Sequence, residues 1–170
     1  MPVHNVKHLD KAVTTEDFLA SVRSCIGTPY RDLGRKKTVA CDCIGLPIIA
    51  ATELGLMVGD VQAYSNMPKN RFCEIMADTY YELEHEGPEL HRVANSDPNS
   101  ILLPGRIGLF WYADRREPQH FCVFGRHPLD SNTVTMIHAH QKIGKVVEAS
   151  LSAFWAKRIV KTYKVPGVIY

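Results

Sequence analysis

Apolar residues recur at helical spacing in the first half of the chain. The first such run follows Thr14, and Asp17 stands three residues further on, which is the pattern of a capping box. We therefore predict a helix that begins at Thr14, preceded by a short arm over residues 1–13. A second apolar run predicts a buried helix that begins near Cys43 and is closed by Gly55.

A third helical stripe covers residues 69–86, and the Gly-Pro pair that follows predicts its end. Residues 94–105 are rich in Asn, Asp, Ser and Pro, and they predict a turn-rich connection. The remainder favours strands, because runs of β-branched and aromatic residues alternate with turns. The predicted strands cover residues 107–112, 120–124, 133–139, 145–149 and 159–163.

Helices come first along the chain and strands follow. This order predicts an α+β fold in which N-terminal helices pack on one antiparallel sheet of about five or six strands. The length of 170 residues is that of one domain with a core of its own. We therefore expect residues 1–170 to form a single domain.

Composition and charge disfavour several classes of function. A net charge of +2 at pH 7 is too balanced to favour nucleic-acid binding. No stretch is long and apolar enough to predict a membrane span, and the first nine residues lack the apolar core of a secretory signal, so we expect synthesis in the cytoplasm. The 5 cysteines, an odd number without such a signal, argue against a disulfide framework and predict a free thiol.

Cys43 is the candidate nucleophile. The second helix is predicted to begin at this residue, and the N-terminal end of a helix favours the negative charge of a thiolate. Gly45 removes a side chain where strands must approach that helix closely. Most cysteines are simply small buried apolar residues, but the sequence Asp42-Cys43-Ile44-Gly45-Leu46 at a helix start favours a reactive thiol.

A catalytic thiol needs a base within hydrogen-bonding reach, and the β-rich half supplies histidines for that role. His120 opens one predicted strand, and His138 lies in the next. Antiparallel pairing would place His138 beside His120, where it would hold the imidazole in the correct tautomer. His140 shares the strand face of His138 and remains an alternative for this third position.

Several short segments follow one another in a defined order along the chain. Gly27-Thr28-Pro29-Tyr30 precedes the segment around Cys43. Four further segments come later: Pro104-Gly105, His120-Phe121-Cys122-Val123-Phe124, Met136-Ile137-His138-Ala139 and Trp155-Ala156-Lys157-Arg158. In this order they resemble the motifs of the NlpC/p60 cysteine peptidases, and the resemblance spans residues 15–165.

The resemblance implies a small papain-like fold and hydrolysis of amide bonds in peptidoglycan stem peptides, next to D-glutamate and the diamino acid. Cys43 would attack the carbonyl group, and His120 would act as base and then as acid, oriented by His138. Tyr30 would lie in the cleft near the developing oxyanion, and the amide N–H of Cys43 would help to stabilise that charge. Asp42 would bind the free amine of the stem peptide.

Four positions depart from the family pattern. Ile44 stands where the family usually has serine, Arg106 replaces an aspartate, Cys122 replaces a glycine, and the segment between His120 and His138 is longer. The aliphatic residue after the cysteine and the absence of a signal resemble members carried in bacteriophage tails. Such proteins are made in the host cytoplasm, assemble with tail-tip proteins and act on the cell wall.

Three alternatives are compatible with the same residues. A papain-like amidase or acyltransferase would use the same cysteine and histidine on another substrate. A non-catalytic tail protein would keep the fold without the activity. Zinc binding by Cys41, Cys43, His120 and His138 is disfavoured by the tight Cys-x-Cys spacing, and we expect neither a metal ion nor a cofactor.

Overall fold

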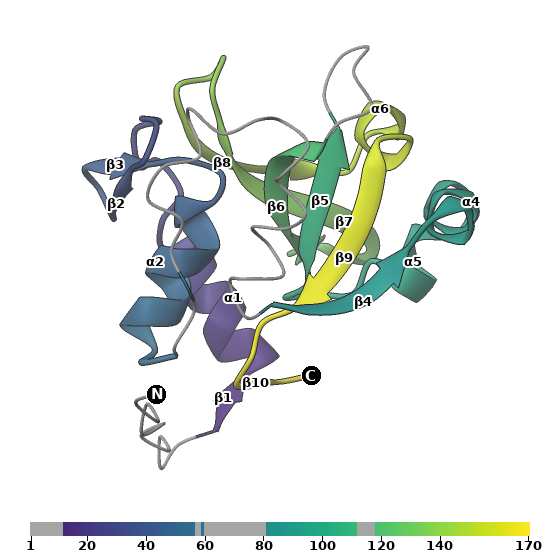
Figure 1. Cartoon of the computed structure of the whole chain (residues 1–170), viewed down its shortest axis with the longest axis horizontal. Coiled ribbons are helices and arrows are strands. Elements are labelled where there is room, and N and C mark those ends of the chain that lie inside the picture. The colour runs from purple at the N-terminus through teal and green to yellow at the C-terminus, as the bar shows by residue number, and fades with distance from the viewer. Residues whose placement is uncertain (1–11, 57–58, 60–80, 112–117) are drawn as a thin grey trace, which may run out of the picture.

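The centre of the fold is a six-stranded antiparallel sheet with the strand order β4-β9-β5-β6-β7-β8 (Figure 1). It is seen in a computed structural model that describes residues 12–56, 59, 81–111 and 118–170. The strands are β4 (Glu82–Glu86), β5 (Ile107–Trp111), β6 (Pro118–His127), β7 (Asp130–His140), β8 (Lys145–Ser150) and β9 (Ile159–Lys164). All five strand predictions are confirmed, and so is the antiparallel sheet.

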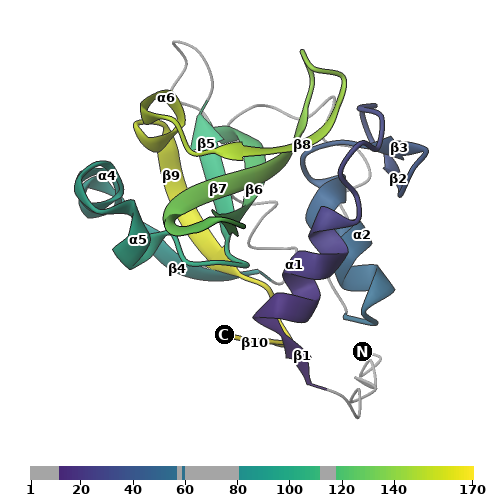
Figure 2. The same ribbon diagram turned by 180° about the vertical axis from the view of Figure 1, so that it is seen from behind.

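Two helices near the N-terminus cover one face of this sheet (Figure 2). Helix α1 (Thr15–Arg23) begins with the predicted capping box, because the Thr14 hydroxyl accepts from the Asp17 N–H at 3.1 Å and the Asp17 carboxylate accepts from the Thr14 N–H. Helix α2 (Gly45–Glu53) follows Ile44 as its N-cap residue. Gly55 has a φ of 72° just beyond its C-cap, as expected of a terminating glycine.

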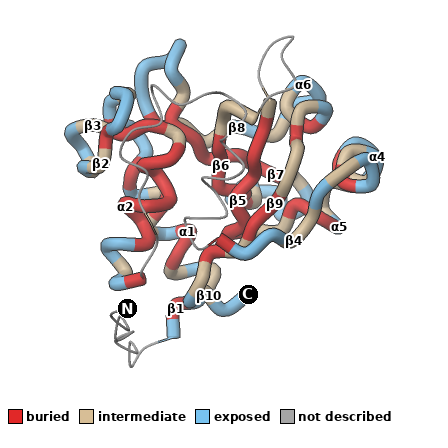
Figure 3. Tube along the Cα trace, viewed as in Figure 1, coloured by how far each residue is buried: buried red, intermediate tan, exposed pale blue. Residues whose placement is uncertain are grey.

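Three further helices cover the opposite face. They are α4 (Pro88–Ser96), α5 (Pro98–Ile101) and α6 (Ala153–Ala156). A second apolar cluster joins them to the sheet; it includes Leu90, Ala94, Phe110, Phe124 and Met136. The sheet is therefore buried on both faces, and Figure 3 shows its central strands, like much of α2, in the colour of buried residues. The prediction named only the N-terminal helices, and α4, α5 and α6 come from later in the chain.

Two secondary-structure predictions were wrong where the structure can be compared with them. Residues 82–86, expected to end a helix, form β4, while residues 69–80 lie outside the described residues. Glu86 of β4 pairs with Lys161 of β9 at 2.9 Å, and such cross-strand charge pairs favour the sheet over the local helical preference of glutamate. The segment expected to be turns contains α5 and the end of α4, because each helix accepts a proline in its first turn.

Short strands complete the fold. β1 (Val13–Thr14) pairs in parallel with β10 (Val168–Ile169), so the end of the predicted arm is part of the fold. β2 (Arg35–Lys36) pairs with β3 (Ala40–Cys41) within the loop that leads to Cys43. Within the described ranges, no helix is long and apolar enough to cross a membrane.

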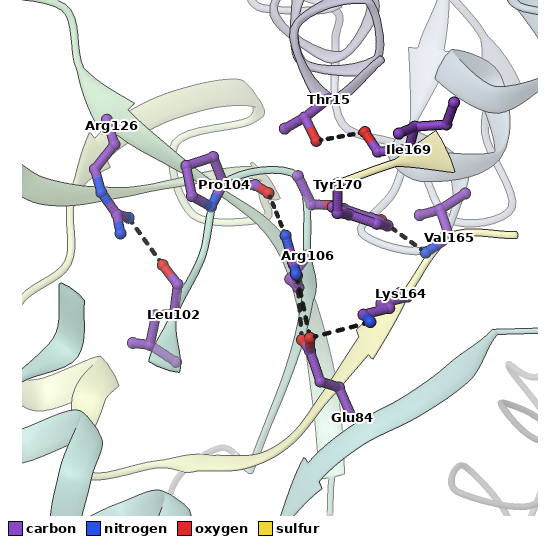
Figure 4. Close-up of polar contacts among 11 residues, drawn as sticks. Thr15, Glu84, Leu102, Pro104, Arg106, Arg126, Lys164, Val165, Ile169 and Tyr170 are labelled. Carbon is purple, nitrogen blue, oxygen red and sulfur yellow. Dashed lines mark hydrogen bonds and ion pairs between the residues drawn. The ribbon is translucent and has the colours of Figure 1, made fainter. Parts of the chain in front are cut away.

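Arg106, which stands where the family pattern has aspartate, fastens the C-terminal segment to the sheet (Figure 4). Its guanidinium group pairs with Glu84 of β4 at 3.2 Å and lies 4.0 Å from the centre of the Tyr170 ring. The Tyr170 hydroxyl accepts from the Val165 N–H at 2.8 Å and donates to the Gly105 carbonyl at 3.2 Å. Arg106 therefore contacts β4 through Glu84 and the C-terminal segment through Tyr170.

Candidate active site

A cavity of about 210 Å³ opens where β6 begins and β7 ends. It brings together four of the five predicted site residues: Tyr30, Cys43, His120 and His138. The fifth, Asp42, does not line it. The remaining lining residues are Gln119, Ala139, His140, Gln141, Lys142 and Trp155.

Asp42 is buried behind the cavity instead of facing a substrate. The residue is 1% exposed, and its carboxylate accepts from the Leu33 N–H at 2.6 Å and the Gly45 N–H at 2.7 Å. Arg35 adds an ion pair at 2.9 Å. The Asp42 oxygens thus join the preceding loop to the start of α2, and the expected contact with a substrate amine stays a prediction. The carboxylate thereby positions the adjacent Cys43.

Gly45 makes this junction possible. A Cβ atom here would fall inside the contact distance of the Gly34 carbonyl oxygen, which is backbone and cannot rotate away. We expect Gly45→Ala to lower the free energy of unfolding by about 1–3 kcal/mol, despite the better helix propensity of alanine. Urea unfolding measures the change, with Thr52→Ala on the exposed side of α2 as the control. An alanine variant as stable as the wild type would contradict the close approach.

The thiol of Cys43 is protonated in the resting protein. Burial and the nearby Asp42 charge raise its pKa to about 12, although the N–H groups of Phe121 and Ile44 donate to the sulfur and oppose the rise. The helix end acts in the expected direction through the Ile44 N–H, but burial has the larger effect on the pKa of Cys43. A nucleophilic role for Cys43 would therefore require a base that removes its proton.

His120 and His138 form a hydrogen-bonded pair inside the cavity. Nε2 of His120 lies 2.7 Å from Nδ1 of His138. Strands β6 and β7 are paired from Val123 and Ile137 to the turn that joins them. His120 and His138 lie on the other side of this first pair, toward the cavity. The structure thus brings His138 to His120, whereas His140 contacts His138, with 5.1 Å between ring centres.

Both imidazoles are neutral near pH 7. Burial and the neighbouring histidines hold the pKa of His120 well below its usual range, and burial together with His140 lowers that of His138 to about 4. For His120 to accept the thiol proton on Nδ1, its Nε2 must carry the hydrogen and donate to Nδ1 of His138. The pair then has one defined tautomer, with His138 as acceptor.

Trp155 of α6 packs against both histidines. Its indole stacks on His120 with 5.2 Å between ring centres, and it meets His138 edge-on at 5.8 Å. It also packs against Phe110 at 5.5 Å, which anchors it to the sheet. Trp155 was recognised in the sequence only as part of a motif, since nothing local indicates that a tryptophan after β8 returns to the cavity.

Tyr30 lies in the cavity as expected, but its hydroxyl is engaged. It donates to the Asp32 carboxylate at 2.8 Å. Burial raises the pKa of Tyr30, and this hydrogen bond raises it further. The proposed zinc ligands do not converge, since the Cys41 sulfur is buried against the Asp42 carbonyl oxygen at 3.2 Å. Across the described residues, no group of three or more His, Cys, Asp or Glu side chains is arranged to hold a metal ion.

Comparison with solved structures identifies the fold. The chain resembles a Staphylococcus aureus protein described as similar to a lipoprotein of the NLP/P60 family, with a TM-score of 0.54. The two share 14% sequence identity over 97% of this chain and 45% of that one, so this chain spans less than half of its neighbour. The fold is therefore NlpC/P60-like. No protein-family model matches the sequence, and no curated protein matches it.

Proposed function

We propose that the protein is a cysteine peptidase that hydrolyses amide bonds in peptidoglycan stem peptides, at the bond from D-glutamate to the diamino acid. The observation that carries the proposal is the placement of Cys43 and the hydrogen-bonded His120–His138 pair on one cavity. The NlpC/P60-like fold and the ordered motifs of the sequence support the same assignment.

In the proposed reaction, the Cys43 sulfur attacks the carbonyl carbon of the amide while its proton passes to Nδ1 of His120. His120 then gives this proton to the leaving nitrogen as the C–N bond breaks, and a thioester with Cys43 remains. Water attacks the thioester and transfers a proton to His120. Cleavage of the C–S bond releases the acid, and the proton returns to the sulfur.

His138 has a positioning role in both halves of this reaction. Because its Nδ1 accepts from Nε2 of His120 at 2.7 Å, it stabilises the positive charge that His120 acquires with each proton. The low pKa of His138 keeps it neutral, so it remains an acceptor throughout the pH range in which His120 works.

A papain-like amidase or acyltransferase is the second candidate. It would use the same cysteine and histidine, and the burial of Asp42 favours it, because the amine contact that the family resemblance implies lies outside the cavity. The two candidates differ only in substrate.

Residence in a bacteriophage tail tip is part of the proposal. It rests on the aliphatic Ile44 after the nucleophile, as in the tail-associated members that the sequence resembles. Mass spectrometry of purified virions would test it: the protein is expected among the tail components, and its absence from them would contradict this location.

The activity is tested by incubating the folded protein with purified stem peptides and identifying the products by mass spectrometry. The wild type is expected to release a fragment that ends at D-glutamate, and Cys43→Ala is expected to release none. Turnover of simple amides without cleavage of stem peptides would favour the amidase. If the folded wild type cleaves neither, the peptidase assignment is wrong.

A further inference from the structure

The positive charge that His120 acquires in the proposed reaction meets little compensation in the cavity lining. Among the described lining residues there is no aspartate and no glutamate, and Lys142 is itself a cation. Burial and the neighbouring His138 and His140 hold the pKa of His120 well below its usual range, so they also oppose the charge. Apart from the sulfur of Cys43, which gives up the proton, the stabilising groups must therefore be neutral.

Trp155 lies flat against the ring of His120. The two rings are stacked, with 5.2 Å between their centres and 30° between their planes. His138 meets the same indole at 82°, so of the two histidines only His120 is stacked on it. The face of an indole carries the negative part of its quadrupole, and it attracts a cation within about 6 Å of the ring centre. The ring that becomes charged is therefore the one that faces this negative surface.

The indole is held in this orientation by its surroundings. Phe110 of β5 meets it edge-on at 5.5 Å between ring centres, and Phe154 does the same at 5.3 Å. The Trp155 N–H donates to the Ser152 carbonyl at 3.0 Å, and the Trp155 carbonyl accepts from the Arg158 N–H at 2.8 Å. The stacked geometry therefore exists before a proton arrives, and a preorganised group stabilises a new charge without the cost of reorganisation.

Shielding from water does not account for a tryptophan at this position. A side chain that only excludes water makes an imidazolium less favourable, because the charge loses its solvent. An aliphatic residue would give that cover equally well. The indole adds its negative face. The two effects act on the proton transfer in opposite directions, so an experiment can tell them apart.

We propose that Trp155 is a positioning residue that stabilises the imidazolium form of His120 through the face of its indole, and that it thereby assists the transfer of the thiol proton from Cys43. The inference rests on the proposed peptidase function and deepens it. It gives α6 a part in the proton transfer, in addition to the acceptor that His138 provides at the other ring nitrogen.

Fluorinated tryptophans test this inference because each added fluorine weakens the negative face and leaves the shape of the side chain nearly unchanged. The chain has 2 tryptophans, so the Trp111→Phe protein carries the label at Trp155 alone. The measurement is the rate at which iodoacetamide alkylates Cys43 at pH 7, followed by mass spectrometry of the peptide that contains it. Trifluorotryptophan is expected to lower this rate about two- to thirtyfold, the range for a lost cation–π contact, with smaller losses for mono- and difluorotryptophan.

Two matched variants accompany the series. Trp155→Leu keeps an apolar cover without the ring face and is expected to slow alkylation by a similar factor, whereas Trp111→Leu, outside the cavity lining, is expected to leave the rate unchanged. An unchanged or faster rate in the fluorinated proteins would overturn the inference.

Alkylation needs no peptide substrate, so it separates this inference from the proposed function. His120→Ala is expected to slow alkylation of Cys43 more than any change at Trp155, because it removes the base itself. If fluorination has no effect while His120→Ala slows the reaction, the inference alone is wrong. If His120→Ala has no effect either, the assignment of His120 as the base is wrong as well.

Discussion

Replacing His120 with alanine is expected to lower kcat for amide hydrolysis by about 10²–10⁴-fold, the contribution of a positioned general base. The size of the effect follows from the state of the nucleophile. Because the pKa of the Cys43 thiol is raised to about 12, almost no thiolate exists at pH 7, and the sulfur depends on a neighbour to take its proton. Steady-state kinetics on a stem peptide, with product formation followed by mass spectrometry, measures the loss.

Two variants make this result specific. His127→Ala removes an exposed histidine from the same strand and is expected to leave kcat unchanged. His138→Ala is expected to lower kcat with little change in KM, because it removes the acceptor that orients His120. A His120→Ala enzyme with wild-type kcat would mean that another group takes the proton. Equal effects of His138→Ala and His140→Ala would remove the distinction between these two residues.

The free energy of unfolding is expected to fall as the pH is lowered from 7 to 4. The pKa of His138 falls from 6.5 in the unfolded chain to about 4 in the folded one, so between these values the unfolded chain binds one more proton. Stability from this residue is complete above pH 6.5 and is lost as the pH falls toward 4. The loss is about 2 kcal/mol at pH 5 and about 3 kcal/mol at pH 4, to which His120 adds in the same direction.

Urea unfolding at pH 7 and pH 5 measures this dependence. The wild type should be clearly less stable at pH 5, and His138→Asn should reduce the difference, because asparagine does not titrate. His127→Asn is the matched control, since it alters an exposed histidine. A wild-type protein with equal stability at both pH values would show that His138 is accessible to protons in the folded state.

Local signals in the sequence predicted the elements that depend on local contacts. The capping box of Thr14 and Asp17 marks the start of α1, because both of its hydrogen bonds lie within one turn. The strand patterns predicted that His120 and His138 lie on neighbouring strands, and alternation along each strand predicts the direction of its side chains. It did not distinguish His138 from His140, because that choice depends on where the β6–β7 pairing ends.

The errors come from contacts between distant segments. β4 is rich in glutamate, and its strand conformation depends on lysines of β9 that lie about 75 residues further along the chain. The burial of Asp42 depends on Arg35 and on the fold of the loop before it. The raised pKa of Cys43 was not predicted, because burial, which the sequence does not reveal, outweighs the effect of the helix end.

The stacking of Trp155 on His120 also determines the direction from which a substrate can reach the base. The indole covers one face of the imidazole ring, and His138 occupies the Nε2 edge. In the proposed reaction, the amide would therefore reach His120 over the ring face that Trp155 leaves open.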